Sequence, residues 1–184
     1  LSGDFKTMTA RGLLAIGRIA LYPNGESPAP LIDGIGLRFD HTVTGDPIAG
    51  NLSLDPGDLR VGELPLSITA TITGYKKASF AVSTGKQDGA VLLGFVPVTL
   101  FPDKDKVTLA GSFDLSVKGE ADMEPEKPVV TFGGSLDLDK VSLAYEGLPR
   151  KIDDMTCSIA FSEKTLDIRK MILSIGASRV DIAG

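Results

Sequence analysis

Apolar side chains at every second position are the feature that most constrains this chain of 184 residues. They are plainest between Thr131 and Gly184. Because successive side chains of a strand point to opposite faces, such alternation predicts β-strands that each have one apolar face. The alternating segments of this stretch are Leu136/Leu138, Val141/Leu143/Tyr145, Met155/Cys157/Ile159/Phe161, and Leu166/Ile168 continuing into Met171/Leu173/Ile175.

The alternation changes phase at one place in this stretch. Apolar residues occupy even positions up to Leu138 and odd positions from Val141 onwards. One extra residue in a strand has this effect, so a β-bulge is predicted at residues 139–140. The same change of phase occurs early in the chain, where it predicts a second bulge or sharp bend at residues 17–18.

The two stretches that share this change of phase also share the order of their later segments. Residues 12–39 with 59–74 match residues 134–159 with 166–184 in apolar spacing and in the place of a Pro-containing turn. This pattern is typical of repeated β-meander units. The first copy carries extra residues within 40–58, which are predicted to form a strand or hairpin arm that the second copy lacks.

The predicted fold is all-β and mostly antiparallel: a long, twisted and curved sheet or groove built from these repeated units. Residues 1–106 are assigned to the first unit, with its extra strand, and residues 107–184 to the second, within one continuous sheet. At most one or two short helices are expected. One is predicted near residues 88–95, capped by Asp88, although a buried strand is the competing interpretation. Residues 56–58 are expected to form a turn between strands.

Composition excludes some functions. The net charge of −5 leaves no basic stripe that would neutralise phosphates, so nucleic acid is not an expected partner. No apolar run approaches the roughly 20 residues that span a bilayer. The chain starts without Met, and we expect it to be a segment of a longer protein.

No catalytic group is predicted. Cys157 is the single cysteine and falls on the apolar side of its alternation, which predicts a buried, inert thiol. His41 is the single histidine and is expected at the surface, at the end of a strand. Two pairs of carboxylates are predicted to be solvated rather than metal-binding or catalytic, because lysines adjoin them and no other ligands lie near. These pairs are Asp137/Asp139 and Asp103/Asp105. No cofactor or metal is expected, and the chain is predicted not to be an enzyme.

The apolar face itself leaves two alternatives open. It is either a closed core, in a structural or adhesion-type β-sandwich with no lipid ligand or in a sheet covered by a helix, or an open, concave groove that holds acyl chains. The residues predicted to line such a groove share one alternation. They are Leu136, Leu138, Met155, Cys157, Ile159, Leu173 and Ile175.

Residues 107–119 and 133–184 resemble the AsmA-like family, relatives of TamB. The shared pattern is a Gly-led strand, a Leu-Pro turn, and further strands separated by glycine. Residues 12–74 fit it as a degenerate copy, although the extra strand near Leu52 departs from the pattern. The matching positions are Gly134, Leu136, Leu138, Val141, Leu143, Tyr145, Leu148, Pro149, Ile152, Asp153, Ile159, Leu166, Ile168, Leu173, Gly176 and Gly184.

The resemblance implies a large envelope protein of Gram-negative bacteria. It implies a periplasmic β-sheet folded into an aliphatic trough, like that of bridge-like lipid transfer proteins. It also implies an inner-membrane anchor in a segment outside this sequence, and a role in phospholipid transport or outer-membrane biogenesis and homeostasis. The expected partner is a phospholipid or another acyl-chain lipid, and the family offers no catalytic residues to carry over.

Overall fold

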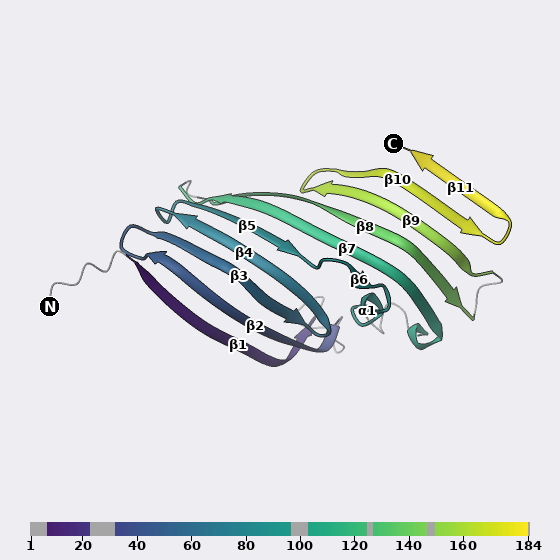
Figure 1. The fold of residues 1–184 in the computed structure, drawn as a ribbon, viewed down its shortest axis with the longest axis horizontal. Helices are drawn as coiled ribbons and strands as arrows, with labels where there is room; N and C mark the ends of the chain where they lie inside the picture. Colours follow the sequence, from purple (N-terminus) through teal and green to yellow (C-terminus); the bar gives the residue numbers. More distant parts are fainter. Residues whose placement is uncertain (1–6, 23–31, 97–102, 125–126, 147–149, 184) are drawn as a thin grey trace.

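The computed structural model describes residues 7–22, 32–96, 103–124, 127–146 and 150–183. It is a single eleven-stranded antiparallel sheet (Figure 1). The strands are β1 (Met8–Leu21), β2 (Ile32–Asp46), β3 (Asn51–Val61), β4 (Leu64–Thr73), β5 (Lys77–Ser83), β6 (Gln87–Asp88), β7 (Val107–Asp122), β8 (Val129–Tyr145), β9 (Ile152–Ser162), β10 (Leu166–Ile175) and β11 (Ser178–Ala183). The predicted all-β fold is confirmed.

The sheet is a meander, because the strands lie side by side in the order in which they occur along the chain. The two-residue strand β6 is the exception, and it pairs with β7 next to the end of β5. No pairing joins β1 to β11 among the described residues, so the sheet is open rather than closed into a barrel. One short helix, α1 (Ala90–Leu93), packs against β6 and β7.

The cross-strand register places the apolar set of every long strand on one face. Across the middle of the sheet, Ile68 pairs with Val82 and Val82 with Val117. The same row continues through Gly134 to Phe161. We call this side the apolar face. The opposite side, which carries the intervening Ser, Thr and charged residues, is the polar face.

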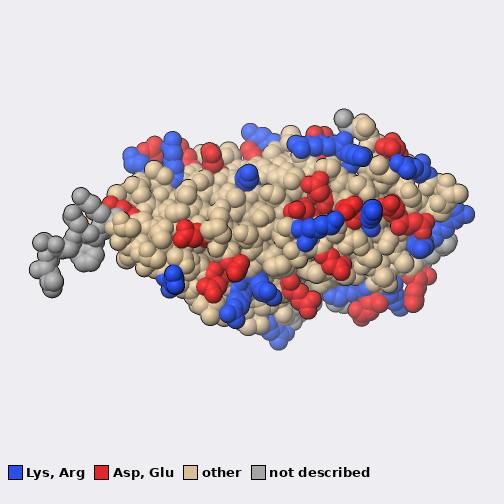
Figure 2. Space-filling model, in the orientation of Figure 1, with Lys and Arg blue, Asp and Glu red and all other residues tan. Residues whose placement is uncertain are grey.

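The sheet is twisted and curved. Figure 2 shows charged side chains of both signs over β7–β11, so the polar face is the one turned to the viewer. In Figure 1, which has the same orientation, one end of β1 and β2 recedes from the viewer. Along that edge the sheet therefore curves toward its apolar side.

Very little of the molecule is buried. Among the described residues, three apolar side chains are buried: Phe113, Val141 and Cys157, which are 2%, 5% and 5% exposed. The accessible surface is 12203 Å². A compact monomer of 19.3 kDa would expose only about 8,500 Å². Such an excess is the signature of a single layer, since a second layer on the sheet would bury one whole face.

Both predicted bulges are confirmed. The pairing of β1 with β2 shifts between Ile16 and Ile19, and that of β8 with β9 shifts between Leu138 and Val141. In the second bulge Lys140 adopts a positive φ of 51°. The extra residue in each strand lets the apolar side chains before and after it stay on one face.

The register around the two bulges is identical. Each pair in β1–β2 has a counterpart in β8–β9 that occupies the matching position on either side of the bulge. The pairs are Leu14–Phe39 and Leu136–Ile159, Ile16–Leu37 and Leu138–Cys157, and Ile19–Ile35 and Val141–Met155.

The predicted match between residues 59–68 and 166–175 is wrong. The second segment is one strand, β10, whereas the first holds the end of β3, a turn at residues 62–63 and the start of β4. The strand next to β2 is β3, so the partner of β10 in the repeat is β3. The extra residues within 40–58 were predicted to form a strand or a hairpin arm, and the structure has the hairpin arm, which lengthens β2 and β3.

Two local predictions are corrected in part. Residues 56–58 lie inside β3 instead of forming a turn, and Pro56 falls where the β3–β4 register shifts, between Leu54 and Gly57. A bulge tolerates proline because it leaves one residue unpaired.

The predicted short helix is confirmed as α1, and the Asp88 carboxylate accepts a hydrogen bond from the Ala90 N–H (2.9 Å), although Gly89 occupies the N-cap. Pro97, which was predicted to end this helix, lies outside the described residues.

Candidate functional site

The seven side chains predicted to line a groove lie on the apolar face of three adjacent strands. Leu136 and Leu138 belong to β8, the next three to β9 and the last two to β10. Leu136 pairs with Ile159, and Leu138 pairs with Cys157. Met155 then pairs with Leu173, which stands two residues before Ile175. The structure therefore brings all seven together in one patch.

The patch is larger than the predicted set. Leu115 and Phe113 of β7 pair with Leu136 and Leu138, and so extend the patch across one more strand. Met171 pairs with Cys157, and the buried Val141 pairs with Met155. Their alternation was visible in the sequence, but the register that places them beside the seven predicted residues depends on the bulge in β8.

The rims of the apolar face are open to solvent. At the β10–β11 end, Leu166 is 69% exposed and Val180 is 48% exposed. At the β1 end, Leu14 is 48% exposed. Between the rims, residues such as Leu136 and Ile159 are half-buried by their neighbours in the sheet. A continuous apolar surface of this kind can bind an apolar ligand along its length, without a specific polar contact.

Aromatic rings cover glycines at several points of this face. A Cβ at Gly119 would meet the ring of Phe80, and one at Gly134 would meet the ring of Phe161. Phe80 pairs with Gly119, and Phe161 with Gly134. Each ring thus occupies the space that the missing side chain of the facing glycine leaves on the neighbouring strand.

The environment of the single thiol disfavours reaction as a nucleophile. Cys157 is buried, as predicted, and burial raises the pKa of its thiol, with a smaller contribution from the negative charge of Asp137. A thiol with a raised pKa is a poor nucleophile at neutral pH.

The prediction for His41 is wrong. β2 continues beyond it to Asp46, and its ring is half-buried on the apolar face. The ring stacks on Phe39 with centroids 4.6 Å apart and lies over Gly12. Its Nδ1 has no hydrogen-bond partner in the described part of the chain. An imidazole is flat and largely apolar, which explains how it fits among aliphatic neighbours.

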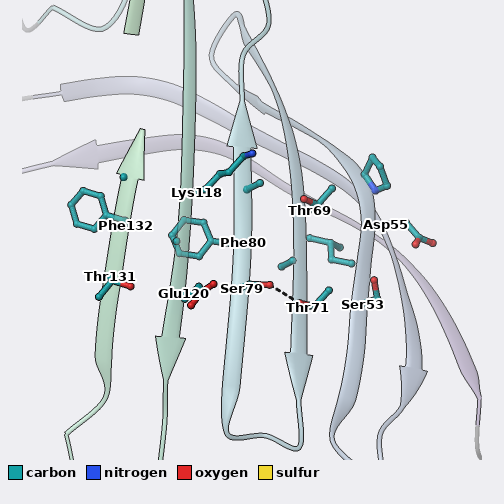
Figure 3. Close-up of a pocket in the computed structure, with 16 residues that line it drawn as sticks. Ser53, Asp55, Thr69, Thr71, Ser79, Phe80, Lys118, Glu120, Thr131 and Phe132 are labelled. Atoms are coloured by element: carbon teal, nitrogen blue, oxygen red, sulfur yellow. Dashed lines mark hydrogen bonds between the residues drawn. The ribbon is translucent and has the colours of Figure 1, made fainter. Parts of the chain in front are cut away.

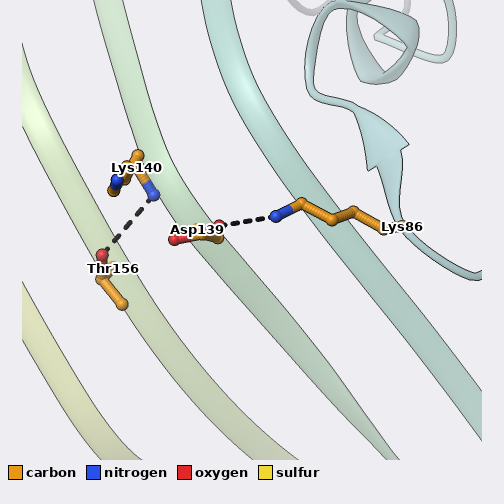
Figure 4. Close-up of polar contacts among 4 residues, drawn as sticks. All are labelled: Lys86, Asp139, Lys140 and Thr156. Atoms are coloured by element: carbon orange, nitrogen blue, oxygen red, sulfur yellow. Dashed lines mark hydrogen bonds and ion pairs between the residues drawn. The ribbon is translucent and has the colours of Figure 1, made fainter.

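The carboxylate pairs make ordinary surface contacts. Asp139 accepts a hydrogen bond from Lys86 at 2.7 Å, beside the backbone N–H of Lys140 that faces Thr156 (Figure 4). The hydrogen bond and charge of Lys86 lower the pKa of Asp139. Asp103 is paired with Lys106 at 2.9 Å, and this contact lowers its pKa in the same way. No group of three or more potential metal ligands occurs among the described residues.

Comparisons of the chain with protein-family models, with curated proteins and with solved structures find no match. Within the described ranges, no helix is both long and apolar enough to cross a membrane.

Proposed function

We propose that this chain is a non-enzymatic segment of a lipid-handling protein, and that the apolar face of its sheet holds the acyl chains of phospholipids or related lipids. The observation that carries the proposal is one continuous apolar face, exposed at its rims, on a sheet that is not closed and that, in the described part of the chain, is covered by no layer beyond the short helix α1 against β6 and β7. A soluble monomer seldom leaves such a large apolar surface without a ligand or partner.

The energetics favour an extended apolar ligand. Each methylene that moves from water onto an apolar surface contributes about 0.8 kcal/mol when fully buried, and less when one side stays exposed. The gain adds up along the chain of the lipid and needs no particular side chain. This explains why the face is built from interchangeable Leu, Ile and Val residues, while glycines and small residues fill the rest.

The resemblance to the AsmA-like family supports a role in the envelope of a Gram-negative bacterium. Under this proposal the sheet is a periplasmic stretch of a protein anchored in the inner membrane by another segment. It would take part in phospholipid transport or in outer-membrane biogenesis and homeostasis. The alternative, a sandwich with a closed core, requires a second layer that the described residues do not supply.

The test uses two substitutions on neighbouring residues of β8. Leu136 lies on the apolar face between Leu115 and Ile159. Ser135 lies on the polar face between Ser116 and Ala160, so it offers a control whose direct cross-strand partners carry no charge. Binding of fluorescent palmitate is measured for the wild type, Leu136→Glu and Ser135→Glu, with circular dichroism to check folding.

We expect Leu136→Glu to stay folded and to lose palmitate binding, because its carboxylate remains hydrated at an open surface but repels the acyl chain. Ser135→Glu should bind like the wild type. A wild type that binds no palmitate contradicts the proposal. So does an unfolded Leu136→Glu beside a folded Ser135→Glu, because an unpaired carboxylate costs several kcal/mol only in a sealed core.

A further inference from the structure

The polar face carries a hollow of its own, across the middle of the sheet. Its volume is about 760 Å³, and it spans β3, β4, β5, β7 and β8 (Figure 3). A second hollow of about 310 Å³ adjoins it and shares Thr71 and Glu120. We call the two hollows together the trough.

The register shows that the trough opens on the polar side. The larger hollow is lined by two polar-face rows that run straight across the strands and by the row between them, Leu54–Ala70–Phe80–Gly119–Phe132. The apolar-face rows on either side, which hold Ile68, Val82, Val117 and Ile72, contribute no residue to its lining. The smaller hollow crosses the row that contains Ile72, Ala78, Ala121 and Val130, but only the two alanines line it. The large side chains of Ile72 and Val130 point to the apolar face and do not line the hollow, so the hollow lies on the other side of the sheet. The two polar-face rows are Ser53–Thr71–Ser79–Glu120–Thr131 and Thr69–Ala81–Lys118–Gly133.

Hydroxyl groups are the commonest polar side chains of the trough. The Thr71 and Ser79 hydroxyls are hydrogen-bonded to each other at 2.6 Å, and Figure 3 shows them pointing toward one another. The side chains of Ser53, Thr69 and Thr131 form no hydrogen bond with any described residue. Each hydroxyl can both donate and accept.

Charges of both signs stand among these hydroxyls. Lys118 and Glu120 project from β7, and Asp55 lies at the β3 side. None of the three takes part in an ion pair within the described part of the chain. The adjoining hollow adds Lys77 and Asp122. Acidic groups therefore slightly outnumber basic ones, which disfavours phosphate and other anions as ligands.

We propose that this trough binds a neutral oligosaccharide chain laid across the strands. Sugar hydroxyls donate and accept in equal measure, as the Ser and Thr hydroxyls do, and a carboxylate such as Glu120 accepts from two neighbouring sugar hydroxyls at once. The rows repeat at the strand spacing of about 4.8 Å, comparable to the length of one pyranose unit. An extended peptide fits less well, because the backbone groups of these central strands are already paired in the sheet.

This site lies on the face opposite the proposed lipid surface and does not depend on that proposal. The experiment titrates cellohexaose and hexa-N-acetylchitohexaose, which are both neutral, into the ¹⁵N-labelled chain and follows amide shifts by NMR. It compares the wild type with Thr71→Val, with the double variant Thr71→Val/Thr131→Val, and with Thr42→Val. Valine keeps the shape and strand preference of threonine. Thr42 is a matched control, because it lies on β2 outside the trough.

Saturable shifts are expected at trough residues with at least one hexamer, insensitive to salt between 50 and roughly 500 mM because the ligand is neutral. Thr71→Val should weaken binding roughly two- to tenfold, the double variant further, and Thr42→Val not at all. Leu136→Glu should bind the hexamer normally.

The absence of saturable shifts with both hexamers overturns the proposal, as does equal weakening by Thr42→Val. Shifts that appear only with an added acidic peptide would assign the trough to another class of ligand and also overturn it.

Discussion

Lys140 shows how much of this fold depends on single residues. Its φ of 51° lies in the left-handed region, which side chains other than Gly, Asn and Asp seldom occupy. The facing residue on β7 is Gly111, whose missing Cβ leaves room for the Lys140 carbonyl and the Val141 backbone. The bulge is thus made by a strained residue on one strand and a glycine on its neighbour.

A β-branched residue at this position should be costly. Lys140→Val is expected to destabilise the chain by about 1–2 kcal/mol, because a branched Cβ collides with its own backbone at positive φ. Lys140→Gly should be close to neutral, since relief of strain and loss of backbone entropy in folding offset each other. Urea unfolding measures both, with Lys118→Val on an extended strand as the control. A Lys140→Val variant as stable as the control would contradict the bulge geometry.

Asp153 offers a test by pH. Its carboxylate accepts the Gly176 N–H at 2.7 Å, and this bond, followed by Lys151, lowers its pKa below the ordinary value of 3.8. A lowered pKa in the folded state adds stability at higher pH that is lost as pH falls through the folded pKa. Asp153→Asn should therefore unfold at lower urea than the wild type at pH 7, and the difference should vanish at strongly acid pH. A difference that persists in acid would refute the assignment.

Among the elements, the register of β7, β8 and β9 depends on glycines beneath aromatic rings. A Cβ at Gly134 would meet the backbone oxygen of Ser116 as well as the Phe161 ring. Backbone in a central strand cannot move aside without disturbing both neighbours, so Gly134→Ala should cost about 1–3 kcal/mol. Gly17 is the control, because nothing lies within 4 Å of its built Cβ. Gly17→Ala should be neutral or slightly stabilising. Equal losses in thermal unfolding would contradict this account.

The existence of the strands and of both bulges was predictable from the sequence, because alternation and its change of phase are local signals. The correct partner of β10 in the repeat was not. The apolar spacing changes phase between Val61 and Leu64 as it does between Ile168 and Met171. The first change is a hairpin turn at Gly62, whose φ is 60°, and the second is a register shift within β10, and spacing alone does not separate the two. His41 was misplaced for a related reason, since a polar residue on the apolar face looks like the end of a strand.

For the molecule as a whole, the sequence predicted which side chains share a face but not whether anything covers them. Leu136 and Ile159 alternate in the same way in a closed sandwich and in an open sheet. The hydroxyl-lined trough was invisible as well, because Ser53 and Thr131 are distant in sequence and meet in one row only through the pairing of five strands.

An open sheet should be larger in solution than a compact domain. A compact chain of 184 residues has a radius of gyration of about 16 Å. Small-angle X-ray scattering of the monomer should give a clearly larger value and an elongated distance distribution. A value near that of a compact domain would show that the apolar face folds onto itself.

The central claim, that the apolar face holds lipid, is tested most directly by native mass spectrometry of the chain after gentle purification from a Gram-negative host. We expect wild-type and Ser135→Glu proteins to carry additional mass that fragments to phospholipid, and Leu136→Glu to carry none. A wild type without bound lipid, or bound lipid that Leu136→Glu retains at the wild-type level, would contradict it.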